Sequence, residues 1–258
     1  MKSEKGSKSN EKRLQSLLMF NASPNIHLKG YTALHIATEQ GPAESVKILL
    51  DFGADSEART EPRQETPIHL ASCQGRLESF SKKIQLLVDK GADINAQNFE
   101  RDTALHLAIC RIGTADAINI LLKSAASTEL KGRNQRTPLQ YAIFLDREEI
   151  AAVLLGHGAN PNCADENGLT PLHLAIRSNK ISTEFLRRLI DAGANINMED
   201  GNHHTPLYEA ITQGRNDAIC LLLNHGAECE PHHQELERYL GHPGLLQKLA
   251  LRLLWHSE

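Results

Sequence analysis

Apolar residues recur along the chain in a two-part pattern that is repeated six times. Each copy opens with a threonine and a short apolar segment, as in Thr170–Ala175 (Thr-Pro-Leu-His-Leu-Ala), and continues with a second apolar run, such as residues 46–50. A threonine before an apolar segment is typical of a helix N-cap, and Pro171 suits the first helical position because no partner is needed there for an N–H group. The spacing of the second run favours another helix. The pattern therefore predicts a pair of helices in each copy.

The copies follow one another at a nearly constant spacing. The motif threonines are Thr32, Thr66, Thr103, Thr137, Thr170 and Thr205, which are 34, 37, 34, 33 and 35 residues apart. Each copy closes on Gly-Ala followed by an acidic residue or asparagine, or on the variant Ala125-Ala126-Ser127. Glycine at this place is a helix stop signal. Such a period indicates a repeat protein, in which each repeat buries its apolar face on its neighbours.

The threonine motif resembles that of the ankyrin repeat, Thr-Pro-Leu-His-x-Ala with a period of about 33 residues. The match is fullest at residues 170–175 and good at residues 32–37, 66–71 and 103–108, whereas Gln140 and Tyr208 stand where histidine is usual. The resemblance implies an all-α ankyrin-repeat solenoid of six full helix-turn-helix repeats with β-hairpin-like connectors, over residues 28–230. The motif histidines are then expected to fix neighbouring connectors by hydrogen bonding; they are His35, His69, His106 and His173.

The segments on either side of the repeats are expected to differ from them. Residues 1–10 are polar and rich in lysine, which predicts a disordered basic tail. Residues 11–27 carry three leucines at helical spacing and are expected to form an N-terminal capping half repeat, and residues 231–258 a C-terminal helical cap.

A second interpretation of residues 231–258 stays open, because their last apolar stretch resembles the elongin-binding start of a SOCS box. In that case Leu246 and Ala250 are the expected elongin contacts, and the resemblance implies recruitment of a cullin ubiquitin ligase while the repeats hold a substrate. The residue before Leu246 is Leu245, where serine or threonine is usual, and the sequence has no cullin-binding half after it.

The second repeat is longer than the others, with four extra residues within the segment 75–90. Four residues amount to about one helical turn, so we expect a longer helix or a longer loop at its start. A tolerated surface insertion and a partner-specific protrusion are both compatible with this addition.

Composition narrows the location and the class of partner. No run of about 18 apolar residues exists, and no apolar signal segment opens the chain, so no membrane contact is expected. Five cysteines, an odd number, favour a reducing compartment, the cytoplasm or the nucleus. The net charge of −4 and an aromatic content of 4% disfavour nucleic acid as the partner.

The sequence offers no candidate for catalysis. It has no glycine-rich phosphate loop, nucleophile elbow or carboxylate dyad, so we expect no enzyme activity and no cofactor. One cluster has near-metal spacing, but it lacks a paired CxxC element, and we expect no metal site; its members are His225, Cys229, His232 and His233.

Function is expected on the concave face, which by resemblance comprises the connector tips and one side of each first helix. Arginine and aromatic residues, the types enriched at binding hot spots, gather at those positions in the middle of the array. The candidate partner-binding residues are Tyr31, Arg63, Phe99, Arg101, Arg111, Arg133, Arg136, Phe144, Arg177 and His204. We expect a protein partner with an acidic and apolar segment over repeats two to five. The alternative is that these arginines form a solvated ladder with nearby acids, namely Glu65, Glu100, Asp102 and Glu166.

Asn95 is a further candidate site by resemblance. Several ankyrin proteins are hydroxylated on a connector asparagine that lies eight residues after a helix leucine and follows an acidic-apolar pair. Leu87, Asp93-Ile94 and Asn95 match this arrangement. The alternative is that Asn95 only stabilises its turn.

Overall fold

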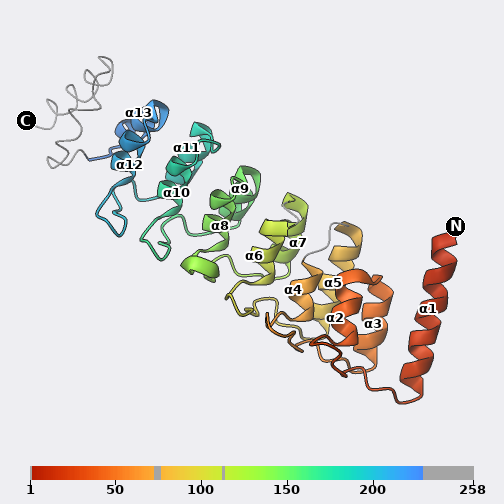
Figure 1. The fold of residues 1–258 in the computed structure, drawn as a ribbon. Helices are drawn as coiled ribbons and strands as arrows, with labels where there is room; N and C mark the ends of the chain where they lie inside the picture. The colour runs from red at the N-terminus through yellow and green to blue at the C-terminus, as the bar shows by residue number, and fades with distance from the viewer. Residues whose placement is uncertain (1, 73–76, 112–113, 229–258) are drawn as a thin grey trace, which may run out of the picture. The chain divides into compact units, whose positions relative to one another are not determined.

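The computed structural model describes residues 2–72, 77–111 and 114–228. This part of the chain contains thirteen α-helices and one short 3-10 helix, and its only β-pairing is an isolated bridge between Leu28 and Tyr31. The chain divides into two compact units, Met1–Arg133 and Asn134–Glu258, and each is described by itself (Figure 1).

Unit 1 contains one helix followed by three helix pairs. The helices are α1 (Lys2–Met19), α2 (Ala33–Gln40), α3 (Ala43–Asp51), α4 (Pro67–Ala71), α5 (Leu77–Asp89), α6 (Ala104–Arg111) and α7 (Ala115–Lys123). The first helices of successive pairs pack together, α2 on α4 and α4 on α6, and the second helices do the same, α3 on α5 and α5 on α7. Helix α1 packs against α3, so it extends the layer of second helices.

Unit 2 repeats this arrangement with three more pairs. Its helices are α8 (Pro138–Phe144), α9 (Glu148–Gly156), α10 (Pro171–Arg177), α11 (Thr183–Asp191), α12 (Pro206–Thr212) and α13 (Asn216–Asn224), and the 3-10 helix η1 (Arg133–Gln135) precedes them. Helix α10 packs between α8 and α12, and α11 between α9 and α13. Each unit is therefore a two-layered stack of helix pairs, and the all-α repeat architecture predicted from the sequence is confirmed.

The expected signals begin and end the helices. Thr170 is extended, with φ −81° and ψ 165°, and its hydroxyl accepts a hydrogen bond from the backbone N–H of His173, which caps α10. The second helices end before a residue in the left-handed region, for example Gly193 at φ 91°. In the third pair this residue is Ala125, at φ 66°, a conformation that costs an L-residue about 1 kcal/mol.

The extra residues of the second repeat lengthen a helix, which was one of the two outcomes expected from the sequence. Helix α5 has 13 residues, whereas α3 and α7 have 9. Lys83 of α5 is 1% exposed, and its ammonium donates to the carbonyl of Thr38, 2.7 Å away, near the end of α2. In a continuing helix the N–H of residue 42 would bond to this carbonyl, but residue 42 is proline, so Lys83 supplies the missing donor. Burial lowers the pKa of Lys83.

The N-terminal segment differs from the sequence prediction. Helix α1 runs from Lys2, so residues 2–10, expected to be a disordered tail, are helical. Once a helix is nucleated, each added residue gains a hydrogen bond, and Lys, Glu, Ser and Asn can extend a helix that contains no proline. Leu18 is 7% exposed on the packed side of α1, whereas Leu17 is 61% exposed.

Residues 229–258, including the expected C-terminal cap with Leu246 and Ala250, lie outside the described residues. Among the residues that are described, none of the helices is long and apolar enough to cross a membrane.

Candidate protein-binding surface

The motif histidines tie each first helix to the next connector. The ring of His69 is fully buried; its Nδ1 accepts from the backbone N–H of Thr66 at 3.1 Å, and its Nε2 lies 3.1 Å from the carbonyl oxygen of Asp102. His173 makes the same pair of contacts, with Thr170 and with the carbonyl of His204, 3.0 Å from Nε2. The expected role of these histidines in fixing connectors is confirmed at both places.

These contacts also determine the protonation state. Because Nδ1 accepts from a backbone N–H, the single proton of a neutral imidazole is on Nε2, which donates to the carbonyl. Burial lowers the pKa of His35 and His173, and it lowers that of His69 from 6.5 to about 4. The histidines are neutral structural donors near pH 7.

Gln140 replaces the histidine in the fourth copy and makes equivalent contacts. Its Oε1 accepts from the backbone N–H of Thr137 at 3.0 Å, and its Nε2 donates to the carbonyls of Cys163 and Leu169, at 2.9 and 2.7 Å. The amide therefore preserves the geometry of the tie without a titratable group.

Connector asparagines form a second set of ties on the other edge of the repeats. Asn95 Oδ1 accepts from the N–H of Ser127 at 2.8 Å, and its Nδ2 donates to the carbonyl of Ala125 at 3.3 Å. Asn162 makes the matching bonds to Asn195 and Gly193. Asn95 thus stabilises the turn of the next repeat, as the structural alternative expected.

The predicted arginines of unit 1 lie around acidic side chains. Glu65 is 3% exposed, and its carboxylate lies 4.0 Å from the Arg63 guanidinium and 3.8 Å from that of Arg111. Burial raises the pKa of Glu65 even though both arginines act in the opposite direction. Arg133 pairs with Glu100. Two of the four acids expected in a solvated ladder therefore do pair with the predicted arginines.

Arg63 and Phe99 form an exposed tip in unit 1. The N–H of Phe99 donates to the carbonyl of Arg63 at 2.9 Å, which places the two residues side by side. Their side chains are largely in solvent: Phe99 is 75% exposed and the Arg63 side chain 69%. Arg101 is exposed on the same connector as Phe99, and Tyr31 lies edge-on to His35 with ring centroids 6.0 Å apart.

Three other predicted residues come together in unit 2, in a groove over α8 and α10. The groove has a volume of about 490 Å³, and Arg136, Phe144 and Arg177 line it with Lys180 and the apolar side chains of Leu169 and Leu174. We call this the α8–α10 groove. Phe144 is 54% exposed, the Arg177 side chain 37% and the Lys180 side chain 79%. The groove therefore combines an aromatic side chain with two accessible cations and one acid, Asp146, which pairs with Lys180.

Arg136 differs from the other predicted arginines because it is buried. Its Nε donates to Asp165 Oδ2 at 3.2 Å, and its guanidinium lies 3.9 Å from the centre of the Phe144 ring. Only 9% of its side chain is exposed, and none of the Asp165 side chain is. Arg136 thus lines the groove from a largely buried position, where it holds Asp165 and the Phe144 ring.

A profile described as ankyrin repeats (3 copies) matches residues 6–98, 80–165 and 153–233. The chain belongs to the ankyrin repeat family. Human ankyrin repeat and SOCS box protein 6 is 30% identical over 239 residues, which is 83% of this chain and 50% of the relative. Human ankyrin repeat and SOCS box protein 16 is 31% identical over 171 residues, 63% of this chain and 37% of the relative. This chain thus spans half the length of the first relative and 37% of the length of the second.

A solved structure gives the same fold. The ankyrin repeat domain of Bcl-3, a member of the IkappaB protein family, matches with a TM-score of 0.71 and 24% identity, over 82% of this chain and 91% of the domain. Ankyrin repeats generally act as non-catalytic protein–protein interaction modules, which agrees with the grooved and partly apolar face of unit 2.

The ankyrin repeats contain one recurring Asp or Asn position that the sequence analysis missed. Five residues before the motif threonine stand Asn98, Asp165 and Asp200, and each side chain accepts from two backbone N–H groups of its own connector. The recurrence of Asp or Asn at this spacing was the available signal. Glu209 of α12 was missed too; it accepts from Arg177 at 2.8 Å.

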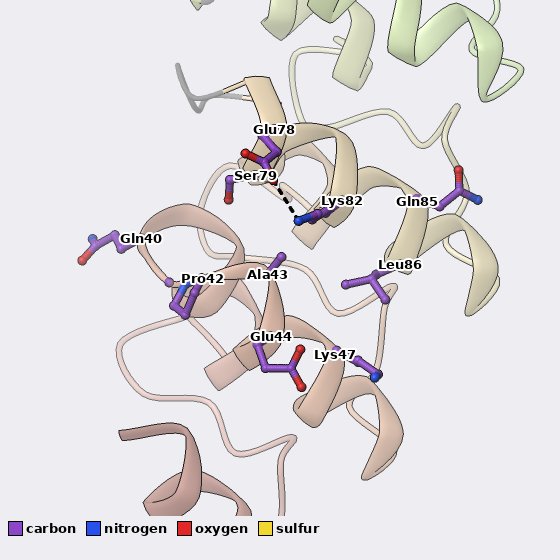
Figure 2. A pocket seen from close by; sticks show the side chains of 11 residues that line it. Gln40, Pro42, Ala43, Glu44, Lys47, Glu78, Ser79, Lys82, Gln85 and Leu86 are labelled. Carbon is purple, nitrogen blue, oxygen red and sulfur yellow. Dashed lines mark hydrogen bonds and ion pairs between the residues drawn. The ribbon is translucent and has the colours of Figure 1, made fainter. Parts of the chain in front are cut away.

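Unit 1 has a larger hollow of about 1210 Å³ between α3 and α5 (Figure 2). Glu78 and Ser79, from the first turn of the lengthened α5, line it with Lys82, Glu44 and Lys47. Glu78 pairs with Lys82 at 3.0 Å, and the two lysines balance the two glutamates. Because its charges cancel, this hollow selects no class of ligand.

Proposed function

We propose that the chain is a protein-binding adaptor whose α8–α10 groove holds a partner segment that carries both apolar and acidic residues. The observation that supports this proposal is the convergence of Phe144, Arg177 and Lys180 over an apolar floor in one groove. Exposed aromatic and cationic side chains around a partly apolar hollow are the usual composition of a binding hot spot.

The cations of the groove set the sign of the partner's charge. Lys180 is paired with Asp146 at 2.9 Å, but 79% of its side chain is exposed, so a solvated pair of this kind is easily exchanged for a partner carboxylate. Arg177 has two buried acids behind it, and its accessible edge can bind a third carboxylate, from a partner. An acidic partner segment therefore meets complementary charge at the rim and apolar surface at the centre.

Selection of random peptides displayed on phage tests the specificity without assuming a partner. We expect the selected peptides to combine Asp or Glu with apolar residues, and the binding of one synthesised peptide to weaken about tenfold or more in Phe144→Ser. Lys180→Glu is expected to slow association and to reduce the salt dependence of binding.

Arg187→Glu is the matched control, since Arg187 is a half-exposed arginine on α11 that pairs only locally, with Glu184 at 3.6 Å. It should bind the selected peptide as the unchanged chain does. Selection of basic peptides, or equal loss of binding in Arg187→Glu and Lys180→Glu, would contradict the proposed groove.

Arg63, Phe99 and Arg101 are proposed as a second contact area, in unit 1. Their exposed tip offers the same combination of aromatic and cationic side chains. Phe99→Ser should weaken binding of peptides selected for this tip about tenfold or more, and should leave binding of a groove peptide unaffected. The remaining candidates, Tyr31, Arg111, Arg133 and His204, are proposed to shape the face around these contacts.

A second candidate function is substrate recognition for a cullin ubiquitin ligase, which the similarity to two ankyrin repeat and SOCS box proteins supports. In this proposal Leu246 and Ala250 contact elongin, and the repeats bind the substrate in the cytoplasm or nucleus. Capture from a cell lysate with the full chain and with a chain ending at Glu230 tests it by mass spectrometry. Elongin retained by the full chain alone supports the proposal, and elongin absent from both samples contradicts it.

Asn95 is proposed as a hydroxylation site of the same module. Both ends of its amide are bonded to the next turn, so a hydroxylase must first open that turn. Peptide mass mapping of the chain expressed in human cells should show one added oxygen on Asn95. Asn25 is the control and should carry none, because Ser23 and Pro24 before it do not match the acidic-apolar pair of the motif. Oxygen on both residues would indicate unspecific oxidation.

A further inference from the structure

Three side chains with metal-ligating atoms meet in unit 2, where the connector before α12 joins that helix. One ligand atom from each of Asp200, His204 and Glu209 lies within 4.8 Å of the other two. Asp200 is 6% exposed and Glu209 is 4% exposed, whereas a third of the His204 side chain is open to solvent. The cluster thus has two buried acids and one accessible imidazole.

One oxygen of this cluster has no hydrogen bond. Asp200 Oδ1 accepts from the N–H groups of Asn202 and His204, at 2.8 and 3.0 Å. Asp200 Oδ2 is buried without a hydrogen-bond partner among the described residues, because the Arg177 guanidinium is 3.6 Å away and the His204 ring 3.8 Å. A buried carboxylate oxygen without a donor is destabilising and unusual in a native protein.

The preceding repeat shows what this oxygen lacks. Asp165 occupies the same position as Asp200, and its Oδ2 accepts from Arg136. The residue that corresponds to Arg136 in the next repeat is Leu169, which has no donor. Asp200 therefore has no arginine at the position that Arg136 occupies for Asp165, and the nearest guanidinium, that of Arg177, stays 3.6 Å from its Oδ2.

We propose that Asp200, His204 and Glu209 bind a Zn²⁺ ion, which gives Asp200 Oδ2 the direct partner that it lacks. Two carboxylate oxygens and one imidazole nitrogen are zinc ligands, and three protein ligands leave a fourth position for water. The imidazole disfavours Mg²⁺ and Ca²⁺, which prefer oxygen ligands.

The cluster is held in place without the ion. The two backbone N–H bonds fix Asp200, and the His204 ring stacks on Tyr208 with centroids 4.1 Å apart. Ligand atoms of a tetrahedral zinc site are roughly 3.3 Å apart, because each metal–ligand bond is about 2.0 Å long. Asp200 Oδ2 and the His204 ring are 3.8 Å apart and all three ligand atoms lie within 4.8 Å, so binding requires them to close by about 0.5 to 1.5 Å.

Arg177 is the competing cation. It donates to Glu209 Oε2 at 2.8 Å, and Gln213 donates to Oε1 at 3.1 Å, so Zn²⁺ must displace one of them. The two carboxylates and one guanidinium leave a formal charge of −1, which still attracts a divalent ion. Arg177→Gln should consequently raise the affinity for Zn²⁺, an effect that an unrelated surface site would not show.

Titration of the full chain with Zn²⁺ in competition with a chromophoric chelator tests the site. We expect His204→Gln to remove one bound equivalent or to weaken it about tenfold or more. His203→Gln is the matched control, because His203 is the neighbouring histidine, is exposed, and has its ring 2.8 Å from Glu199 rather than in the cluster. It should bind Zn²⁺ as the unchanged chain does.

Leu169→Arg gives an independent test that keeps all three ligands. The new guanidinium should donate to Asp200 as that of Arg136 donates to Asp165. The variant should therefore remain folded and lose the same bound Zn²⁺ ion that His204→Gln loses. The proposal is overturned if the unchanged chain binds no Zn²⁺, if His204→Gln and Leu169→Arg both bind it undiminished, or if His203→Gln loses as much as His204→Gln.

Discussion

Two neighbouring joints in unit 2 share a backbone design and differ in how their side chains complete it. Arg136 and Asp165 form one, which we call the closed joint, and Leu169 and Asp200 stand at the same positions in the other, which we call the open joint. In each, one backbone hydrogen bond links successive connectors, Glu166 N to Asn134 O at 3.2 Å and Gly201 N to Asn167 O at 2.9 Å. The backbone frame is therefore held in both.

The difference lies in charge and titration. In the closed joint the guanidinium neutralises the buried acid, and the tie to the next connector is the amide of Gln140. In the open joint Oδ2 of Asp200 has no hydrogen-bond donor, and two imidazoles, His173 and His204, lie nearby. The shared motif thus secures the fold, whereas the residue before the motif threonine decides whether a joint is inert or able to bind an ion.

The largest expected effect comes from opening the closed joint. Arg136→Leu makes it resemble the open joint and leaves Asp165, whose side chain is fully buried, without its partner. Removing one member of a buried ion pair costs about 3–5 kcal/mol, because the other charge stays buried and uncompensated. Urea unfolding measures this loss in the free energy of unfolding of unit 2.

The control is the double variant Arg136→Leu, Asp165→Asn, which removes the stranded charge and should recover most of the lost stability. If the double variant is as unstable as Arg136→Leu, the loss comes from packing around Phe144 rather than from the buried acid.

A histidine tie should respond to acid, whereas a glutamine tie should not. The pKa of His69 is about 4 in the folded chain and 6.5 as its ordinary value, so between these pH values the unfolded state binds more protons. Stability is therefore fully present above about pH 6.5 and falls as the pH is lowered to about 4, by about 3 kcal/mol for this residue.

His69→Gln gives this tie the amide of the closed joint and should reduce the pH dependence of the free energy of unfolding over that window, and the part that remains comes from His35 and His173, whose pKa burial also lowers. Gln140→Ala, at the tie that already lacks an imidazole, should lower stability by the same amount at every pH. A His69→Gln variant that keeps the full acid sensitivity would show that the imidazole is not the titrating group.

Much of this fold follows from local sequence. The threonine, the proline and the histidine or glutamine three positions after the threonine interact within one turn, as in Thr170 and His173, so the motif predicts both the helix start and the tie. The nearly constant connectors likewise place the four extra residues of the second repeat inside the helical pair, whereas the choice between a longer helix and a longer loop came from the structure.

The candidate site was less predictable because its pairs join residues about one repeat apart. Arg136 and Asp165 are 29 residues apart, and Arg177 and Glu209 are 32, so neither pairing appears in a local pattern. Resemblance placed Arg136 and Phe144 on one face, and only the structure shows that Arg136 is largely buried, with its guanidinium against the Phe144 ring. The helical state of residues 2–10 was missed for another reason: composition alone does not report that a helix is already nucleated next to them.

The smallest expected effect comes from neutralising the acid of each joint in turn. The free energy of unfolding is measured with a chelator present, so that no bound ion contributes. Asp200→Asn keeps the oxygen that accepts from Asn202 and His204 and removes a charge whose nearest cations are too far for hydrogen bonds, so stability should change by less than about 1 kcal/mol. Asp165→Asn strands a buried guanidinium and should cost about 3 kcal/mol. Equal losses in the two variants would mean that Arg177 closes the second joint across 3.6 Å, and the distinction between the joints would then fail.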